Sequence, residues 1–329
     1  ARGLGHRFGH VGSGQPEVNG CGDVSVGVTP RRVGAVPPDA LSAALRTSGL
    51  FLRMDPFVVH VRSAIPIVAD GIQRLYAGHT CWTEVGEFAD FHVSVRRKWR
   101  PSRPLCVFEM DGHAPFTPLA YGEAYAFLEW GLNWCITSYC HNWITLHSAV
   151  LERDGRAVIL PAPPGSGKST LCAALMLDGW RLLSDEMALL DPRTGLLTAS
   201  PRPISLKNAS IDIMRRRAPD AVMGPVALDT LKGTVCHMQV SADSTARARE
   251  LATPAWIIYP RYVAGAPLTL SPRPKADALL NLHRNSFNHH VHGRQGFETL
   301  ADVVERCDVY DLHYSDLDEA LACFARLSA

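Results

Sequence analysis

The sequence lacks an excess of either charge, since 33 Lys and Arg side chains are balanced by 32 acidic ones in 329 residues. Without a global electrostatic field, binding to nucleic acid or to an anionic membrane is not expected. Long apolar runs are also missing. The most apolar long segment, residues 119–140, carries Glu123, Glu129 and Asn133, which argues against a membrane span. We therefore expect no nucleic-acid partner and no transmembrane helix.

The nine cysteines are scattered, without a paired CxxC zinc motif or the spacing of a disulfide framework. A basic start followed by an apolar run, which would mark a secretory signal, is missing too. Reduced cysteines are typical of the cytoplasm, where we expect this protein.

Composition divides the chain into three parts. Residues 1–40 hold nine of the 26 glycines and four prolines, with little apolar periodicity. Such a segment cannot bury enough surface to offset its ordering entropy, so we predict a disordered N-terminal extension. Residues 41–141 are predicted to form a small α+β domain without a catalytic motif. Residues 142–329 alternate strand and helix patterns, which predicts an α/β nucleotide-binding domain.

Hydrophobic periodicity predicts the elements of both domains. In the first domain we expect strands near 57–61, 88–95 and 105–110 and helices over 65–76 and 121–139. In the second we expect strands at 143–150, 157–161, 181–184, 188–190, 196–198, 234–240, 255–259, 268–270 and 309–314, and helices at 208–216, 275–285, 298–305 and 316–327.

The stretch "PAPPGSGKSTL" matches a Walker A phosphate-binding loop between a predicted strand and a predicted helix. Glycine permits the backbone angles that point N–H groups at phosphate, and the helix N-terminus adds partial positive charge. Lys168 would pair with the terminal phosphates, and Ser169 or Thr170 would hold Mg²⁺ through its hydroxyl. The predicted nucleotide-binding residues are Pro164, Gly165, Ser166, Gly167, Lys168, Ser169 and Thr170.

A second motif, "RLLSDEMALL", places Asp185 and Glu186 after the next predicted strand. Two adjacent carboxylates permit a division of labour, in which one orients Mg²⁺ and the other accepts a proton from an attacking hydroxyl. We predict Asp185 and Lys168 as catalytic residues. Ser169, Asp185 and Glu186 are the predicted metal ligands.

These motifs resemble the HPr kinase/phosphorylase family, and most closely its HPr-kinase-related kinase A branch. The resemblance rests on "TLHSAVLERDGRAVILPAPPGSGKSTL", "RLLSDEMALL" and "PRPISLKNASI", with later support from "LKGTVCHM", "AWIIYPRY", "NSFN" and "YDLHYSDLDEA". It covers roughly residues 41–329 and is strongest from His147 onward.

The resemblance implies a P-loop kinase domain of the phosphoenolpyruvate-carboxykinase-like type that transfers a phosphoryl group from ATP to a serine hydroxyl. It also implies that His147, on the strand before the phosphate loop, is a catalytic residue that contacts the transferring phosphate or pairs with Asp185. The chain departs from the parent family at Thr170, at Glu186 and in lacking an Asn-x-Arg-Gly signature. Phosphorylase activity, a hexamer and HPr as substrate are therefore not carried over. A homo-oligomer stays open.

Several basic residues have open roles. Lys207 is a candidate for a phosphate or acceptor contact, and Lys232, with His237 on the next predicted strand, is another candidate basic group. Arg261 ends a predicted strand and is a candidate for contact with the nucleotide or with a domain partner. The "NHHVH" run, with His289, His290 and His292, has no cysteine or carboxylate at ligand spacing and predicts a surface loop.

Two classes of function are compatible with these motifs. The first is an ATP- and Mg²⁺-dependent kinase acting on a hydroxyl of a peptide, protein or carrier, or of a small molecule. The second is a nucleotide-gated binding module. The adjacent carboxylates favour the kinase, because a switch does not need a base for an acceptor.

Overall fold

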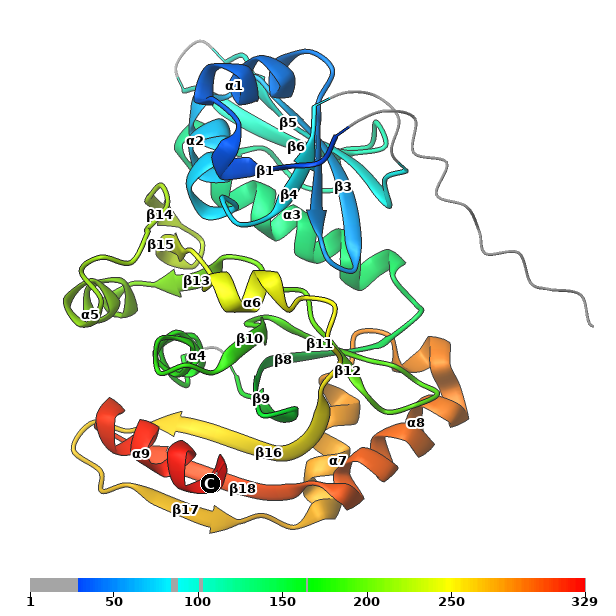
Figure 1. Cartoon of the computed structure of the whole chain (residues 1–329), viewed down its shortest axis with the longest axis vertical. Helices are drawn as coiled ribbons and strands as arrows, with labels where there is room; N and C mark the ends of the chain where they lie inside the picture. Colours follow the sequence, from blue (N-terminus) through cyan, green and yellow to red (C-terminus); the bar gives the residue numbers. More distant parts are fainter. Residues whose placement is uncertain (1–28, 84–87, 101–102, 164, 329) are drawn as a thin grey trace, which may run out of the picture.

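The computed structural model describes residues 29–83, 88–100, 103–163 and 165–328, and these form a mixed α/β structure with three sheets (Figure 1). No helix within these ranges is both long enough and apolar enough to cross a membrane.

The first sheet has the strand order β1-β4-β2-β3-β5-β6-β7. Alternate residues of β3 are buried, as expected for a sheet with one covered face. Helices α1, α2 and α3 pack against it and share its apolar core. The elements are β1 (Arg31–Arg32), α1 (Pro38–Arg46), β2 (Leu50–Met54), β3 (Phe57–Ser63), α2 (Pro66–Leu75), β4 (Thr80–Trp82), β5 (Phe91–Lys98), β6 (Leu105–Met110), β7 (Leu119–Ala120) and α3 (Ala124–Tyr139).

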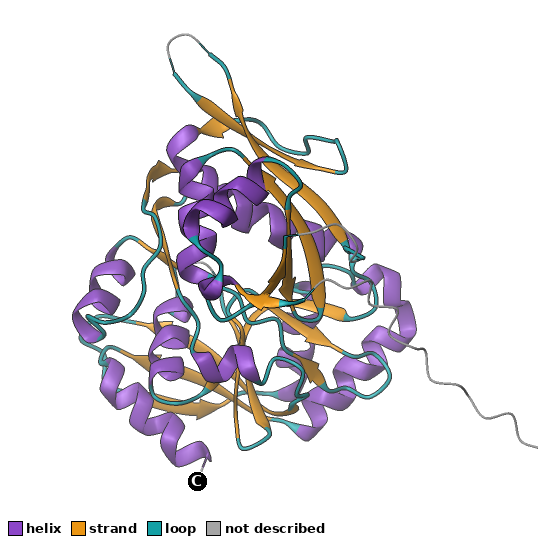
Figure 2. Cartoon of the chain, turned by 45° about the horizontal axis from the view of Figure 1, so that its top comes forward, coloured by secondary structure: helices purple, strands orange, loops and turns teal. Residues whose placement is uncertain are grey.

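The second sheet has the order β12-β11-β8-β9-β16-β18-β17, with β10 also paired to β8. Successive residues of β8 point into two different cores, Ala149 toward α4 and α9 and Val150 toward α7 and α8, so helices cover both faces (Figure 2). The strands are β8 (Ile144–Arg153), β9 (Arg156–Pro161), β10 (Arg181–Ser184), β11 (Met187–Leu190), β12 (Leu197–Thr198), β16 (Thr253–Tyr262), β17 (Thr269–Pro272) and β18 (Asp308–Tyr314). The helices are α4 (Lys168–Leu177), α7 (Lys275–Arg284), α8 (His289–Arg306) and α9 (Leu317–Ser328).

A small third sheet, β13-β15-β14, lies between the other two (Figure 1). Its apolar side chains Ala227 and Val235 pack on Ala126 and Trp130 of α3. The elements of this layer are β13 (Ile204–Lys207), α5 (Ala209–Arg217), β14 (Ala227–Thr230), β15 (Gly233–Met238) and α6 (Ala242–Ala246).

The predicted mixed α/β architecture and most predicted elements are confirmed, with strand and helix ends shifted by a few residues. The N-terminal extension is a correction. Residues 31–40 contain β1, a 3-10 turn and the start of α1, and Val33 is fully buried, so they belong to the packed structure. A predicted extension over 1–40 is therefore too long, and residues 1–28 lie outside the described residues. The "NHHVH" histidines lie on α8 and not in the predicted loop.

The predicted domain boundary at residue 141 falls in the connection between α3 and β8. Packing crosses it, because Met187 and Leu189 of β11 belong to the core of the first sheet. The His79 ring also bonds across it, with Nε2 2.8 Å from the Pro201 carbonyl oxygen.

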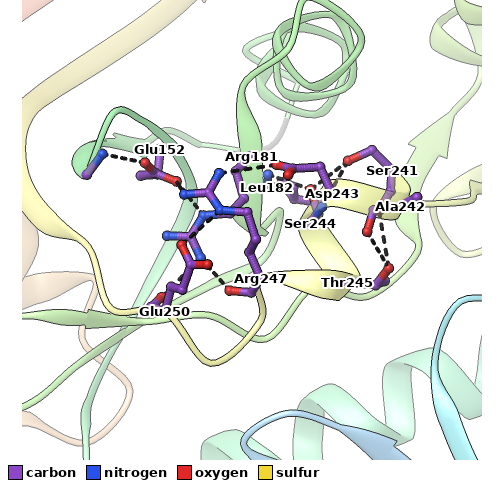
Figure 3. A network of polar contacts seen from close by, with 11 residues as sticks. Glu152, Arg181, Leu182, Ser241, Ala242, Asp243, Ser244, Thr245, Arg247 and Glu250 are labelled. Carbon is purple, nitrogen blue, oxygen red and sulfur yellow. Dashed lines mark hydrogen bonds and ion pairs between the residues drawn. The ribbon is translucent and has the colours of Figure 1, made fainter.

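A buried ion pair joins β8 to β10, where Glu152 and Arg181 are 0% and 1% exposed at their side chains (Figure 3). Arg181 also donates to the carbonyl oxygens of Arg247, at 2.7 Å, and of Glu250, at 3.0 Å. Burial alone would raise the pKa of Glu152, but the bonds from Arg181 and from the Gly155 N–H hold it below its ordinary value. The pair thus ties the second sheet to the segment after α6.

Removing one partner of this pair leaves the other charge buried and unpaired. We expect Glu152→Gln to lower the free energy of unfolding by about 3–5 kcal/mol, measured by urea denaturation. The matched control is Glu109→Gln, whose partner Arg96 is 60% exposed, and it should cost under about 1 kcal/mol. If both variants lose the same free energy of unfolding, the buried pair does not stabilise this sheet more than an exposed pair does.

Candidate active site

The loop between β9 and α4, predicted to bind phosphate, contains two glycines with positive φ angles. Gly165 and Gly167 have φ angles of +84° and +88°, which side-chain-bearing residues rarely adopt. A Cβ added at Gly165 would meet nothing within 4 Å, so there is room beside it for a ligand. A Cβ at Gly167 would lie 2.7 Å from the Tyr314 hydroxyl oxygen, so only glycine fits there. Pro164 lies outside the described residues.

The far side of the loop is held by the ends of β16 and β18. The Tyr262 N–H donates to the Ser166 carbonyl oxygen at 2.9 Å, and the Tyr314 hydroxyl donates to the Gly167 carbonyl oxygen at 3.4 Å. The Ser166 hydroxyl is buried and has no partner among the described residues. The loop is therefore anchored through the carbonyls of Ser166 and Gly167, while inside it the Ser166 N–H donates to the Pro163 carbonyl oxygen at 3.3 Å.

Helix α4 begins at Lys168, directly after Gly167. The first N–H groups of a helix have no intrahelical partner and attract an anion. The Lys168 side chain is only 9% exposed, and its Nζ donates to the Asp185 carbonyl oxygen at 2.8 Å. Ser169 and Thr170 follow and are half-buried. The structure thus brings the start of α4, behind the predicted phosphate loop, together with the carboxylate motif.

Asp185 and Glu186 form the whole connection between β10 and β11. The Ser184 hydroxyl oxygen accepts from the Glu186 N–H at 3.3 Å and the Met187 N–H at 3.1 Å, which fixes the turn. Both strands pair with β8, and Met187 pairs with His147. Pairing of two short strands with one long strand therefore sets the carboxylates beside His147.

The two carboxylates have different surroundings. Asp185 is 5% exposed, and its Oδ2 accepts from the Ser205 N–H at 2.9 Å. Burial, and then the negative charge of Glu186, raise the pKa of Asp185 to about 7. Glu186 has its Oε1 4.0 Å from Lys207 Nζ. Burial alone would raise the pKa of Glu186, but Lys168 and Lys207 hold it below its ordinary value. Glu186 is therefore the member of the pair that is ionised at neutral pH.

His147 lies next to Glu186, with 4.0 Å between its Nε2 and the Glu186 Oε2. Its ring stacks on Phe287 with centroids 5.7 Å apart, and its backbone N–H donates to the Asn285 carbonyl oxygen at 2.9 Å. Burial, and then the charge of Lys168, lower the pKa of His147. At neutral pH the imidazole is thus neutral and can either donate or accept a hydrogen bond.

The remaining basic candidates separate into two groups. Lys207 and Lys232 belong to the site, since both lower the pKa of Glu186, and Lys232 Nζ lies 5.2 Å from the centre of the Trp130 ring of α3. His237 is 2% exposed and packs edge-on against Tyr125, in the core. Arg261 is exposed on β16. On α8, the histidines join no group of three or more His, Cys, Asp or Glu suited to a metal ion in the described ranges.

Sequence reasoning missed the residues that support the site from other strands. These are Ser205 on β13, Phe287 before α8, and Tyr262 and Tyr314 at the ends of β16 and β18. Tyr262 carried a weak signal, because it follows Arg261 in the "YPRY" segment at a strand end. Its nearness to the loop depends on the strand order, which local periodicity does not give.

The residues present fit a magnesium nucleotide. The open space at Gly165 and the unpartnered Ser166 hydroxyl suit a phosphate, and the Ser169, Asp185 and Glu186 oxygens are the hard donors that Mg²⁺ prefers. Magnesium commonly takes only one or two protein carboxylates and completes its shell with phosphate oxygens and water. A full protein cage is therefore not needed here.

Comparisons with known proteins add little. No family model and no curated protein matches the chain. Among solved structures, the HPr(Ser) kinase/phosphatase from Coxiella burnetii matches with a TM-score of 0.25 and 17% identity, over 56% of this chain and 96% of that one. A likeness this weak bears on neither mechanism nor substrate.

The raised pKa of Asp185 has a consequence for stability without ligand. Between its ordinary value of 3.8 and about 7, the folded state binds more protons than the unfolded state, so stability falls as pH rises through this window. Asp185→Asn removes that dependence. We therefore subtract the melting temperature of wild type from that of the variant at each pH. This difference should be several degrees higher at pH 8 than at pH 5. If the difference in melting temperature between the variant and wild type is the same at both pH values, the pKa of Asp185 is not raised by its surroundings.

Proposed function

We propose that the protein is a P-loop kinase that transfers the γ-phosphoryl group of ATP to a hydroxyl, that of serine in a peptide, protein or carrier. One observation carries the proposal: Lys168, the first residue of the helix behind the glycine loop, contacts the turn that holds both carboxylates. Phosphate-binding and proton-accepting groups therefore meet at one point. The resemblance to the HPr kinase/phosphorylase family supports the same reaction and a phosphoenolpyruvate-carboxykinase-like type of fold.

Nucleotide binding is assigned to the loop and the start of α4. The N–H groups of Gly165 and Gly167 would face a phosphate, and Lys168 would neutralise charge on the terminal phosphates. Mg²⁺ would be held by Ser169 and Glu186 and would offset charge on the β- and γ-phosphates. Glu186 suits this role because its cationic neighbours keep it ionised.

Transfer needs a base for the acceptor proton, and we assign that role to Asp185. The acceptor oxygen forms a bond to the γ-phosphorus, the bond to the bridging oxygen breaks, and the acceptor proton passes to Asp185. Asp185 is held in place by the Ser205 N–H, and a pKa near neutrality suits a base that must take up and release a proton. We assign to the neutral His147 a hydrogen bond donated to the transferring group.

The acceptor is expected to approach along α3. Lys232 packs on Trp130 of that helix, and its positive charge also lowers the pKa of Glu186. The N-terminal part of the chain therefore reaches the edge of the site. This gives residues 41–141, predicted as a domain without a motif of its own, a role in holding the acceptor.

The nucleotide assignment is tested by Lys168→Ala. Loss of a buried cation facing the phosphates should weaken Mg-ATP binding roughly 100-fold by calorimetry. Lys168→Met keeps most of the buried stem and should behave alike, while Lys275→Ala on α7 is the surface control. If both Lys168 variants bind Mg-ATP as tightly as wild type, the assignment of the nucleotide site to this loop is wrong.

The carboxylate roles are separated by Asp185→Asn and Glu186→Gln. Asp185→Asn should bind Mg-ATP within a few-fold of wild type yet transfer phosphate about 10²–10⁴-fold more slowly, because an amide cannot accept the proton. In Glu186→Gln, adding Mg²⁺ should increase the affinity for ATP less than it does in wild type. Both are read from calorimetry and from γ-labelled ATP transfer analysed by mass spectrometry. A normal rate in Asp185→Asn with an inactive Glu186→Gln would reverse the assignment.

A further inference from the structure

We infer that Tyr262 is the stacking surface for the nucleobase of the bound nucleotide. This subsite rests on the proposed nucleotide-binding function and adds a residue to it. It lies at the end of β16, on the opposite side of the phosphate loop from the carboxylates.

The position of Tyr262 is fixed against the loop. Its N–H donates to the Ser166 carbonyl oxygen at 2.9 Å. A Cβ built on Gly167 would lie 3.0 Å from the Tyr262 Cβ, so the tyrosine side chain starts in contact with the loop. A nucleotide bound at the loop would have the Tyr262 side chain as a near neighbour.

The ring of Tyr262 is exposed although it is large and apolar. It is 51% exposed, whereas its strand partner Tyr314 is 2% exposed. The two rings meet edge-on, with centroids 5.9 Å apart and an interplanar angle of 75°. Tyr314 packs against the Tyr262 ring on one side, and an exposed aromatic side chain is a favourable platform for stacking a base.

Sheet order sets which end of the nucleotide lies near Tyr262. On one side of β9 are β8 and β11, with His147 and the Asp185–Glu186 turn, and on the other are β16 and β18. β9, β16 and β18 run parallel (Figure 1), so their carboxyl ends meet at one edge, where ligands of such sheets bind. With the terminal phosphates toward the carboxylates, the nucleoside extends toward the ends of β16 and β18.

The test compares two ligands, Mg-ATP and Mg-tripolyphosphate, by calorimetry. Tripolyphosphate has the phosphates and no base. Tyr262→Ala should weaken ATP binding about tenfold and leave tripolyphosphate binding unchanged, since stacking on an aromatic ring is lost. Tyr262→Phe keeps the ring and should bind ATP like wild type. The matched control is Tyr139→Ala, a residue of α3 that is similarly exposed at 54%.

The outcomes separate this subsite from the proposed function. Unchanged ATP affinity in Tyr262→Ala overturns the subsite alone. Equal weakening of both ligands also overturns it, because Tyr262 would then act on the loop and not on the base. A wild-type protein that binds neither ligand overturns the nucleotide site and the subsite together.

Discussion

The hydrogen bond from the Lys168 ammonium to the Asp185 carbonyl oxygen is the contact around which the site is organised. It fixes the start of α4 to the β10–β11 turn, and so sets the distance between the phosphate loop and the carboxylates. The turn in turn depends on β8, which pairs with β10 and β11 and brings His147 alongside. The buried Glu152–Arg181 pair secures the other end of the same β8–β10 pairing.

The loop-bearing strand β9 divides the site into two halves. Its antiparallel neighbour β8 leads to the titratable groups, where burial and charge drive the pKa values of Asp185 and Glu186 in opposite directions. Its parallel neighbour β16 leads to Tyr262, which is polar only at its tip and sits against the loop. In the proposed mechanism, proton transfer and nucleoside binding therefore lie on opposite sides of one loop.

Much of this was predictable from the sequence because the signals are local. Glycines at 165 and 167, the lysine that follows and the adjacent carboxylates lie within short motifs, and alternation or helical periodicity gives β3, β8, β9 and α2. Long-range pairing is not encoded locally. The Ser205 N–H that holds Asp185, the Phe287 ring on His147 and the anchoring of the loop by Tyr262 each join segments far apart in the chain. Residues 31–40 were misjudged for a related reason: Val33 is buried only because the strands and helices of the first sheet surround it.

The most direct test of the central claim follows the γ-phosphoryl group itself. γ-Labelled Mg-ATP is incubated with the protein alone and with a fractionated extract of its own cells, and label is counted in inorganic phosphate and in each acceptor fraction. A kinase that places a substrate hydroxyl at Asp185 positions water poorly, so it should release little labelled phosphate alone and transfer label to a hydroxyl in the extract. Rapid phosphate release without extract, no labelled acceptor, and partner binding that depends on the nucleotide would contradict transfer and indicate a nucleotide-gated module.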